Sequence, residues 1–266
     1  MKIIDLQGNE KGKIDLPVQF KEELRLDLIQ RSVEVIQANK RQAYGAKPSA
    51  GLRASAELSR RRHDYRGSYG HGISRVPRKI MSRAGTRMNW VGAVAPGTVG
   101  GRRAHPPKAK KIFEKSINIK ERKKAIRSAL SAFLNKELVE KRGHLVPKNY
   151  PFIIENELES LEKTKEVKAT LEKIGLKEEL ERTSSKKIRA GKGKLRGRKY
   201  RVKKGPLIVT SKVCNLFNSA KNIVGLDIVQ IKDINCELLA PGAVPGRLII
   251  FTEDAIKELK EKSLFI

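Results

Sequence analysis

Short apolar runs that alternate with helical or turn-like connectors predict an α/β fold for this chain. Three such runs lie near its end, at 207–210, 226–231 and 247–251. Short helices or turns are expected between them, at 214–222 and 233–239. Each run has the length of a strand buried on both faces. Strands separated by helices favour a mainly parallel sheet with flanking helices and crossover connections.

The start of the chain predicts a strand pair that leads into a helix. Residues 2–6 and 13–16 are expected to form a short hairpin-like start. An amphipathic helix is expected over 22–38, because its apolar positions recur at the spacing of one helical face. These positions are Leu24, Leu28, Val33 and Ile36.

The middle of the chain predicts further helices. A helix is expected over 119–138, where apolar side chains share one face. These side chains are Ile126, Leu130, Phe133, Leu134 and Leu138. A short strand is expected at 151–155. An acidic-rich helix over 156–174 and a second helix directly after it should follow. Near the end, Thr252 is expected to cap a last helix.

Residues 40–111 interrupt this pattern, because neither a helical nor a strand period persists in them; 54–62 alone favours a short helix. The segment holds 10 of the 21 glycines and 5 of the 11 prolines. It holds the one tryptophan and three of the five tyrosines, but no phenylalanine. A connection this long is either a functional extension or a disordered segment. We therefore expect a single α/β domain over 1–266, interrupted by an extended loop at 40–111.

Positive charge is concentrated in two segments. The formal net charge of the 266 residues is +29. Residues 40–111 contain 18 lysines and arginines against two acids, and residues 186–204 contain 11 against none. The remaining 175 residues carry a net charge of +2. A nearly neutral domain with two cationic segments predicts a polyanionic partner.

The run at 186–204 is the strongest local signal for RNA binding. Its glycines allow the backbone to lie close to phosphates, its cations supply charge, and Tyr200 can stack on a base. In 40–111, arginines outnumber lysines by 12 to 6. A planar guanidinium grips phosphate or stacks on a base. The alternatives are a nuclear-localisation signal or a disordered tail for the run, and a flexible linker or a solvated loop for 40–111.

Catalytic and metal-binding patterns are weak. The four histidines have no partners at metal-ligand spacing, and Cys214 and Cys236 favour neither a zinc site nor a disulfide framework. The GxxxxG skeleton at 92–99 lacks the lysine of a phosphate-binding loop. No cofactor, metal site or enzymatic activity is therefore expected.

Nothing in the sequence predicts a membrane protein. No apolar run approaches the roughly 20 residues that a membrane-spanning helix needs. The first residues lack the apolar region of a signal peptide. An intracellular protein is expected.

Six blocks of the sequence resemble archaeal and eukaryotic members of the ribosomal protein L-four family, named after the universal large-subunit protein of that number. They cover most of the chain in family order, which is far more specific than one basic motif. The stretch at about 83–99 resembles the family least. The blocks are GISRVPR (72–78), GGRRAHPPK (100–108), ERKKAIRSALSA (121–132) followed by RGH (142–144), RAGKGKLRGRKYRVKKGPLIV (189–209), AKNIVGLDIV (220–229) and LAPGAVPGRLIIFTEDA (239–255).

The resemblance implies a structural component of the large ribosomal subunit without catalytic activity. It implies an α/β domain on the subunit surface and a long loop that threads through the rRNA. The loop helps to line the polypeptide exit tunnel, and the family binds rRNA early in subunit assembly. The implied partners are large-subunit rRNA, other large-subunit proteins and the nascent polypeptide, on cytoplasmic ribosomes and without a membrane.

The cations of the two segments are the expected rRNA contacts. On the loop they are Arg60, Arg61, Arg62, Arg75, Arg78, Lys79, Arg102, Arg103, Lys108, Lys110 and Lys111. On the run at 186–204 they are Lys186, Lys187, Arg189, Lys192, Lys194, Arg196, Arg198, Lys199, Arg201, Lys203 and Lys204.

The end of the loop is expected to face the tunnel. Residues 84–101 carry one charge, between basic flanks at 60–79 and 102–111. A surface exposed to a passing chain functions better with few adhesive charges. The alternative is that this stretch packs into an rRNA crevice, with Trp90 stacked on a base. The expected tunnel-facing residues are Arg87, Met88, Asn89 and Trp90.

Two other functional classes remain open from the residues alone. An RNA-processing or RNA-modifying enzyme would need a clustered acid–base or metal set, which no spacing in the sequence indicates. A nucleic-acid packaging or chaperone protein would be distinguished by competition between folded rRNA and duplex DNA.

Overall fold

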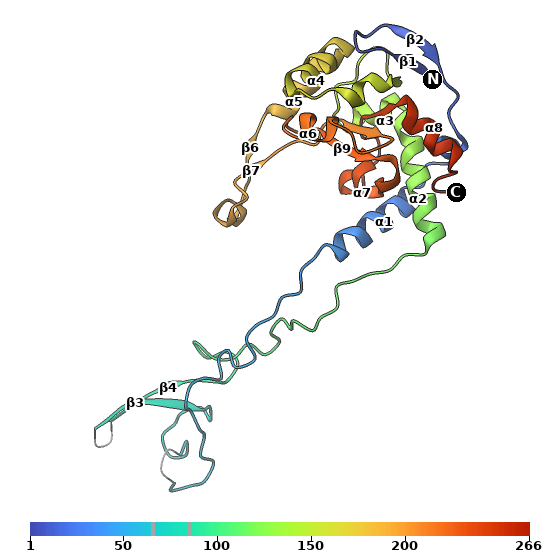
Figure 1. The fold of residues 1–266 in the computed structure, drawn as a ribbon. Helices are drawn as coiled ribbons and strands as arrows, with labels where there is room; N and C mark the ends of the chain where they lie inside the picture. The colour runs from blue at the N-terminus through green and yellow to red at the C-terminus, as the bar shows by residue number, and fades with distance from the viewer. Residues whose placement is uncertain (65–66, 85–86) are drawn as a thin grey trace. The chain divides into compact units, whose positions relative to one another are not determined.

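The computed structural model describes residues 1–64, 67–84 and 87–266, and for residues 83, 84, 87 and 88 it describes the backbone alone. The chain divides into two units (Figure 1). We call Met1–Lys40 with Glu114–Ile266 the core domain, and Arg41–Phe113 the extension.

The core domain is built on a six-stranded sheet with the order β2-β1-β5-β10-β8-β9. Neighbouring strands are parallel except for β1 and β2, which form an antiparallel pair. The predicted mainly parallel sheet is confirmed, and the hairpin-like start is present, but its second strand lies at Glu10–Lys13 and not at 13–16. The strands are β1 (Lys2–Ile4), β2 (Glu10–Lys13), β5 (Phe152–Ile154), β8 (Leu207–Thr210), β9 (Asp227–Gln230) and β10 (Ile249–Thr252).

Helices cover this sheet, as the alternating pattern predicts (Figure 1). Helices α1 and α2 pack on each other and on α7, while α4 packs on α6 and α8 lies against β10 and β8. The helices are α1 (Leu26–Asn39), α2 (Ile119–Ser131), α3 (Lys136–Lys141), α4 (Thr164–Leu171), α5 (Lys177–Ser184), α6 (Leu216–Ala220), α7 (Cys236–Leu239) and α8 (Glu253–Glu261). Shorter helical turns are η1 (Val18–Lys21), η2 (Ala132–Leu134), η3 (Asn156–Ser160), η4 (Glu172–Leu176), η5 (Lys192–Arg196), η6 (Ile231–Asp233) and η7 (Pro241–Ala243).

The central strands are buried on both faces. Every residue of β5, β8 and β10 is buried, as expected for parallel strands between two helical layers. Phe251 of β10 packs edge-on against Phe20 and Phe133, with ring centroids 5.5 Å and 5.4 Å away. The core thus joins the start, middle and end of the chain.

Two predicted helices are shorter than the sequence pattern indicates. The helix expected over 119–138 is interrupted, because the side chain of Asn135 accepts hydrogen bonds from the amides of Glu137 and Leu138 and begins α3. Asparagine is a preferred N-cap residue, so it starts a new helix here. The acidic stretch begins as η3, and α4 starts at Thr164. Gly175, with φ 98°, then separates α4 from α5.

The extension is more ordered than its composition predicts. Strands β3 (Arg78–Ala84) and β4 (Arg87–Gly92) form an antiparallel hairpin in which Ile80 pairs with Trp90. Leu58, Val76, Ile80 and Trp90 line one small cavity together.

The helix predicted at 54–62 is wrong. Glu57 and Ser59 instead form β-bridges to Arg78 and Gly67, so pairing with more distant residues overrides the local helical preference.

The stretch at 84–101, which carries the single charge of Arg87, does not form one continuous loop end. Its first part belongs to the β3–β4 hairpin, and Gly85 and Thr86 lie outside the described residues. Its second part folds into a compact turn at 93–101. The Ala93 amide donates to the Pro77 carbonyl, and the Arg102 amide donates to the Val94 carbonyl.

The last helix, α8, is capped differently from the prediction. The Thr252 hydroxyl donates to Glu159 at 2.7 Å and makes no cap bond. Instead, the side-chain oxygen of Asn156 accepts from the Asp254 amide at 2.9 Å. A residue of η3 therefore satisfies a free amide at the start of α8, a type of bond that local sequence spacing does not indicate.

Replacing Asn156 with alanine should destabilise the core domain by about 1 kcal/mol, because the α8 amide loses its acceptor. Urea-induced unfolding of the purified protein measures this change. Asn149→Ala, at an exposed position, is the matched control and should change the free energy of unfolding much less. Equal stability of the Asn156 variant and the control would show that this cap is not stabilising.

Candidate nucleic-acid interface

The basic run at 186–204 forms a hairpin that projects from the core domain (Figure 1). Strands β6 (Lys187–Ile188) and β7 (Tyr200–Arg201) pair antiparallel, with Ile188 opposite Tyr200. The turn η5 lies between Gly191 and Gly197, which have φ values of 76° and 75°. Few residues other than glycine adopt this conformation, so the glycines close the hairpin. We call residues 186–204 the basic hairpin.

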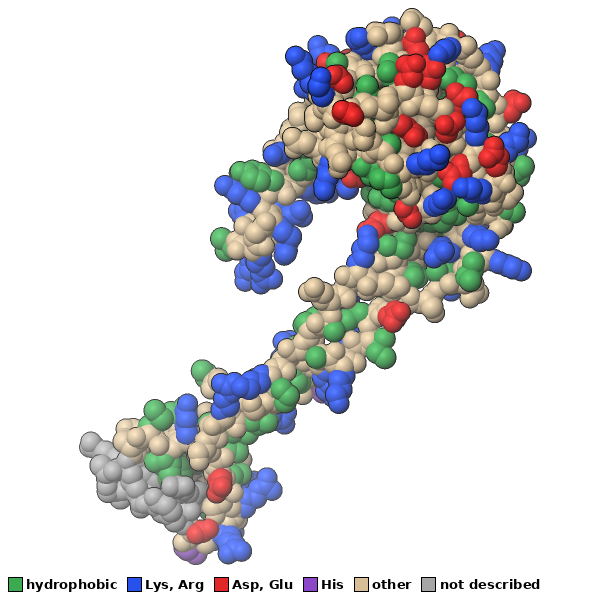
Figure 2. All heavy atoms as spheres, viewed as in Figure 1, with side chains coloured by type: hydrophobic (Ala, Val, Ile, Leu, Met, Phe, Trp, Pro, Cys, Tyr) green, Lys and Arg blue, Asp and Glu red, His purple; other side chains and the backbone are tan. Residues whose placement is uncertain are grey.

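The cations of the basic hairpin are presented to solvent. All eleven are exposed except Arg189, which is half-buried and donates to the Arg198 carbonyl at 3.2 Å. Among the described residues, only Lys204 of this set forms an ion pair, with Asp227 at 3.0 Å. Figure 2 shows lysines and arginines over the basic hairpin, whereas acids and cations are interspersed over the rest of the core domain.

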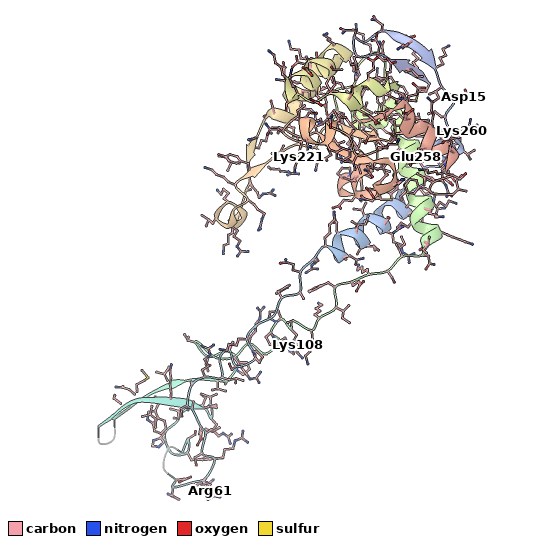
Figure 3. The ribbon with its side chains drawn as sticks, in the orientation of Figure 1. Asp15, Arg61, Lys108, Lys221, Glu258 and Lys260 are labelled. Carbon is pink, nitrogen blue, oxygen red and sulfur yellow. The ribbon has the colours of Figure 1, made fainter. Side chains whose placement is uncertain are left out.

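The predicted contact cations of the extension are also exposed to solvent. Of the eleven predicted contacts there, all are exposed except Arg78, which is half-buried. Figure 3 labels two of them, Arg61 and Lys108. In the described part of the chain, every recorded ion pair lies in the core domain. The predicted contact residues therefore lie on two surfaces where cations greatly outnumber acids.

Some extension cations contact aromatic rings. The guanidinium carbons of Arg62 and Arg75 lie 5.9 Å and 5.7 Å from the centroid of the Tyr69 ring. Arg75 also donates to the Tyr69 hydroxyl at 3.3 Å. These cation–π contacts order the arginines without removing their charge.

The predicted tunnel-facing residues are only partly described. The side chains of Arg87 and Met88 lie outside the described residues. Asn89 is exposed and donates to the Ser82 hydroxyl at 2.7 Å. Trp90 is half-buried, and its indole nitrogen is enclosed without a recorded hydrogen-bond partner. Trp90 thus packs within the extension, and Asn89 is the described side chain that faces solvent.

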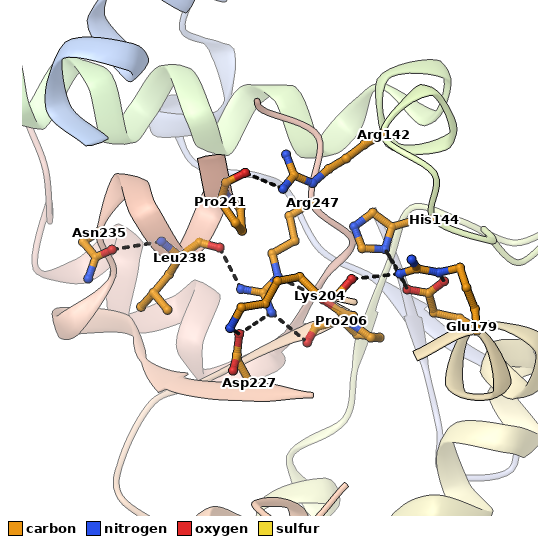
Figure 4. A network of polar contacts seen from close by, with 12 residues as sticks. Arg142, His144, Glu179, Lys204, Pro206, Asp227, Asn235, Leu238, Pro241 and Arg247 are labelled. Atoms are coloured by element: carbon orange, nitrogen blue, oxygen red, sulfur yellow. Dashed lines mark hydrogen bonds and ion pairs between the residues drawn. The ribbon is translucent and has the colours of Figure 1, made fainter. Parts of the chain in front are cut away.

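A buried arginine fixes the end of the basic hairpin to the core domain (Figure 4). Arg247, whose side chain is fully buried, donates to the carbonyls of Gly205 and Leu238, both at 2.9 Å. It also donates to the Asp227 carboxylate at 2.6 Å. Burial lowers the pKa of Arg247, and the Asp227 charge opposes that shift. Asp227 further pairs with Lys204, so one carboxylate holds both the hairpin's last residue and the buried arginine.

A second buried network holds the same root from the other side. His144 Nδ1 lies 2.7 Å from a Glu179 oxygen, and Arg182 pairs with the same carboxylate at 2.7 Å. Arg182 also donates to the Lys204 carbonyl at 2.8 Å. The networks thus meet at Lys204, where the hairpin rejoins the sheet (Figure 4).

Burial sets the protonation states in this second network. Burial lowers the pKa of His144, and its hydrogen bond to Glu179 opposes this shift only in part. For Glu179, burial favours the neutral acid, but hydrogen bonds from Arg182, His144 and the Leu145 amide outweigh it and lower the pKa. A neutral imidazole therefore donates to a charged carboxylate.

Sequence reasoning missed both networks. A possible signal was the position of Arg247 directly before an apolar strand, because a charge at the edge of a buried run needs an internal partner. Its partners lie far away in the chain, so spacing does not identify them.

The described residues give two further negative observations. No helix in this part of the chain is long and apolar enough to cross a membrane. No group of three or more histidine, cysteine, aspartate or glutamate side chains gathers there in a way that could hold a metal ion.

Comparison with known proteins gives consistent matches over almost the entire chain. The model of the ribosomal protein L4/L1 family matches residues 14–262. The large ribosomal subunit protein uL4 of Nanoarchaeum equitans is 50% identical over 264 residues, which cover 99% of this chain and 98% of that relative. Proteins of the same name from Archaeoglobus fulgidus and Methanocaldococcus jannaschii are 42% and 43% identical, each over 98% of both chains.

RNA affinity should lose part of its salt dependence when the basic hairpin is neutralised. Each neutralised phosphate contributes a slope of roughly −0.7 to −0.9 to log K against log salt. Five substitutions to glutamine should therefore flatten the slope by up to about 4 units in a filter-binding titration. The substituted residues are Lys192, Lys194, Arg196, Arg198 and Lys199.

The matched control neutralises five lysines that already form ion pairs with acids in the core domain. These are Lys2, Lys11, Lys115, Lys257 and Lys262. The control should retain more of the salt slope than the hairpin variant. An unchanged slope in the hairpin variant would mean that the hairpin does not face RNA.

The core domain should become less stable as the pH is lowered, because His144 is buried in its neutral form. In the unfolded chain the histidine pKa is about 6.5, and in the folded protein it is lower. The unfolded state therefore binds more protons as the pH falls below about 6.5. The stabilisation from neutral His144 is fully present above that pH. It is lost as the pH falls through the pKa that His144 has in the folded protein. Glu179 adds a second loss in stronger acid, because its folded pKa is below its usual 4.5.

Urea unfolding at several values between about pH 5 and 8 measures this dependence. His144→Asn keeps an N–H donor for Glu179 but does not titrate. The stability advantage of the unmodified protein over this variant should therefore shrink as the pH falls. A constant difference across the range would contradict the buried neutral histidine.

Proposed function

Because the chain belongs to the ribosomal protein L4/L1 family, we propose that it is a structural component of the large ribosomal subunit that binds large-subunit rRNA. The match over residues 14–262 confirms the family resemblance seen in the sequence. In this proposal, the protein is part of cytoplasmic ribosomes and has no enzymatic role. Its partners are rRNA and other large-subunit proteins. It contributes to early assembly of the subunit.

One observation carries the rRNA-binding proposal. The basic hairpin and the extension expose many more cations than acids, and in the described residues Lys204 is the one cation of the basic hairpin with a recorded ion pair. In the core domain, by contrast, many exposed cations form ion pairs with acids. Exposed unneutralised cations gain most from a partner that brings a high density of phosphates. The core domain then serves as the folded support that holds the basic hairpin at a fixed root.

The predicted cations divide into two contact sets in this proposal. The basic hairpin binds phosphates beside the core domain, with Gly191 and Gly197 keeping its backbone narrow enough to approach the RNA closely. The extension binds phosphates along its length through its arginines and lysines. Both sets give positioning contacts, which fix the protein on folded RNA without reading its sequence.

In this proposal, the end of the β3–β4 hairpin faces the exit tunnel. Ser82 and Asn89 face each other across β3 and β4, and Asn89 is exposed. The polar, uncharged side chains of Ser82 and Asn89 limit adhesion to a passing nascent chain at this end, which also contains Arg83 and Arg87. Trp90 packs inward with Ile80 and so supports the hairpin from within the extension. The alternative, in which Trp90 stacks on an rRNA base, requires that packing to open.

Shortening the β3–β4 hairpin should distinguish a role in the tunnel from a role as an RNA anchor. Residues 82–89 are replaced by a short Gly/Ser turn, which removes the end but keeps the Ile80–Trp90 pair and the basic flanks. The tagged variant should still co-sediment with large subunits, because it loses Arg83 and Arg87 but keeps the basic flanks at 60–79 and 102–111. Stalling at arrest peptides, or sensitivity to antibiotics that bind the tunnel, should change.

A Gly/Ser replacement of equal length is the control, because it keeps the reach of the hairpin and removes its side chains. Loss of subunit assembly in the shortened variant, with normal translation by those subunits that do form, would identify the hairpin end as an RNA anchor. Failure of the unmodified protein to co-sediment with large subunits would contradict the proposed function itself.

A further inference from the structure

A cavity of about 570 Å³ lies within the extension, where its outgoing and returning segments run side by side. This volume falls in the usual range of ligand pockets, ~300–1,000 Å³. The described residues that line it combine two aromatic rings, a pair of prolines and a group of cations. The set contains no acid.

Close backbone contact holds the two segments together at this position. The Ala46 amide donates to the Pro107 carbonyl at 2.9 Å. A Cβ atom on Gly45 would lie only 2.4 Å from the Ala109 nitrogen, so glycine alone permits this approach. These contacts hold Pro107, which lines the cavity, against the outgoing segment.

An aromatic pair forms one wall of the cavity. The rings of Tyr44 and Phe113 are stacked, with centroids 5.9 Å apart and planes inclined by 10°. The guanidinium carbon of Arg41 lies 4.0 Å from the centroid of the Phe113 ring, and Lys111 Nζ lies 5.5 Å from the same centroid. Phe113 is thus engaged by neighbours, whereas Tyr44 is 59% exposed. The Tyr44 ring offers a surface on which a further planar group can stack.

Four cations also line the cavity. Arg103, Lys108, Lys110 and Lys111 border the cavity and are all exposed. No ion pair is recorded for any of them among the described residues. An occupant that combines a planar ring with negative charge would satisfy both the aromatic wall and these cations. An unpaired nucleotide of RNA has this combination, because its base stacks on aromatic side chains and its phosphates meet the cations.

We propose that this cavity binds an unpaired nucleobase of RNA, stacked on Tyr44, with the adjoining phosphates held by Arg103, Lys108, Lys110 and Lys111. The inference rests on the proposed rRNA-binding function and adds to it a defined site at the base of the extension. Pro106 and Pro107 also line the cavity, and their rings limit the conformations of the backbone there. The site thus selects single-stranded RNA, since a base within a duplex cannot reach the ring.

Filter binding of the full-length protein to a large-subunit rRNA transcript tests the proposal. Tyr44→Leu should weaken binding about 5- to 150-fold, the range for loss of one base–aromatic stack. The salt slope should stay the same, because no charge changes. Tyr44→Phe keeps the ring and should bind like the unmodified protein. Ile112→Ala, at an exposed apolar position of the extension that does not line the cavity, is the matched control and should bind like the unmodified protein.

A second variant reports on stacking directly. Tyr44→Trp should keep the affinity, and rRNA should quench its fluorescence beyond the change seen for the unmodified protein, in which Trp90 is the only tryptophan. This readout remains informative if Tyr44→Leu perturbs the local fold. Adenosine monophosphate serves as a free-nucleotide probe in the same assay.

The outcomes separate this inference from the proposed function. If the unmodified protein does not prefer large-subunit rRNA to small-subunit rRNA, the proposed function is wrong. If it does, but Tyr44→Leu keeps full affinity and the Tyr44→Trp variant shows no extra quenching, the pocket inference alone is wrong. Quenching by adenosine monophosphate without any effect of Tyr44→Leu on rRNA binding would likewise overturn it, since the cavity would then accept a free nucleotide instead of rRNA.

Discussion

Repulsion among exposed cations is the constraint on which the organisation of this protein depends. A chain of net charge +29 cannot pack these groups together, because burying unpaired charge is far more costly than exposing it. The charge is therefore placed on the basic hairpin and the extension, while the core domain pairs its own cations with acids. RNA phosphates complete the neutralisation, so binding and charge balance are the same event.

The attachment of the basic hairpin follows from this constraint. Because its cations repel one another, the basic hairpin needs a rigid attachment to the core domain. Arg247 provides this attachment through hydrogen bonds to two carbonyls and to the Asp227 carboxylate. Breaking such a buried pair typically costs about 3–5 kcal/mol. The fixed root limits how much order the hairpin must gain when it binds RNA, which favours affinity.

The sequence predicts well whatever depends on local pattern. The buried strands at 207–210 and 247–251 were predictable because continuous apolar runs of that length rarely form anything else between two helical layers. The basic run at 186–204 was recognisable because no acid interrupts it, but its hairpin pairing was not predicted. The predictions fail where contact with a residue distant in sequence determines the local structure. Glu159 draws the Thr252 hydroxyl away from its helix, and pairing with Arg78 prevents a helix around Glu57.

The aromatic site of the extension shows the same limit and explains why charge alone does not describe this protein. Tyr44 and Phe113 lie at opposite ends of the extension's sequence, so no spacing brings them together; the contact of Gly45 with Ala109 does. Phosphate contacts give affinity that is nearly independent of sequence, and they tolerate sliding of the protein along RNA. A stacked base does not tolerate sliding, because the ring accepts one nucleotide at one place. Cations and a stacking platform therefore perform different tasks: the first hold the extension on RNA, and the second sets its register there.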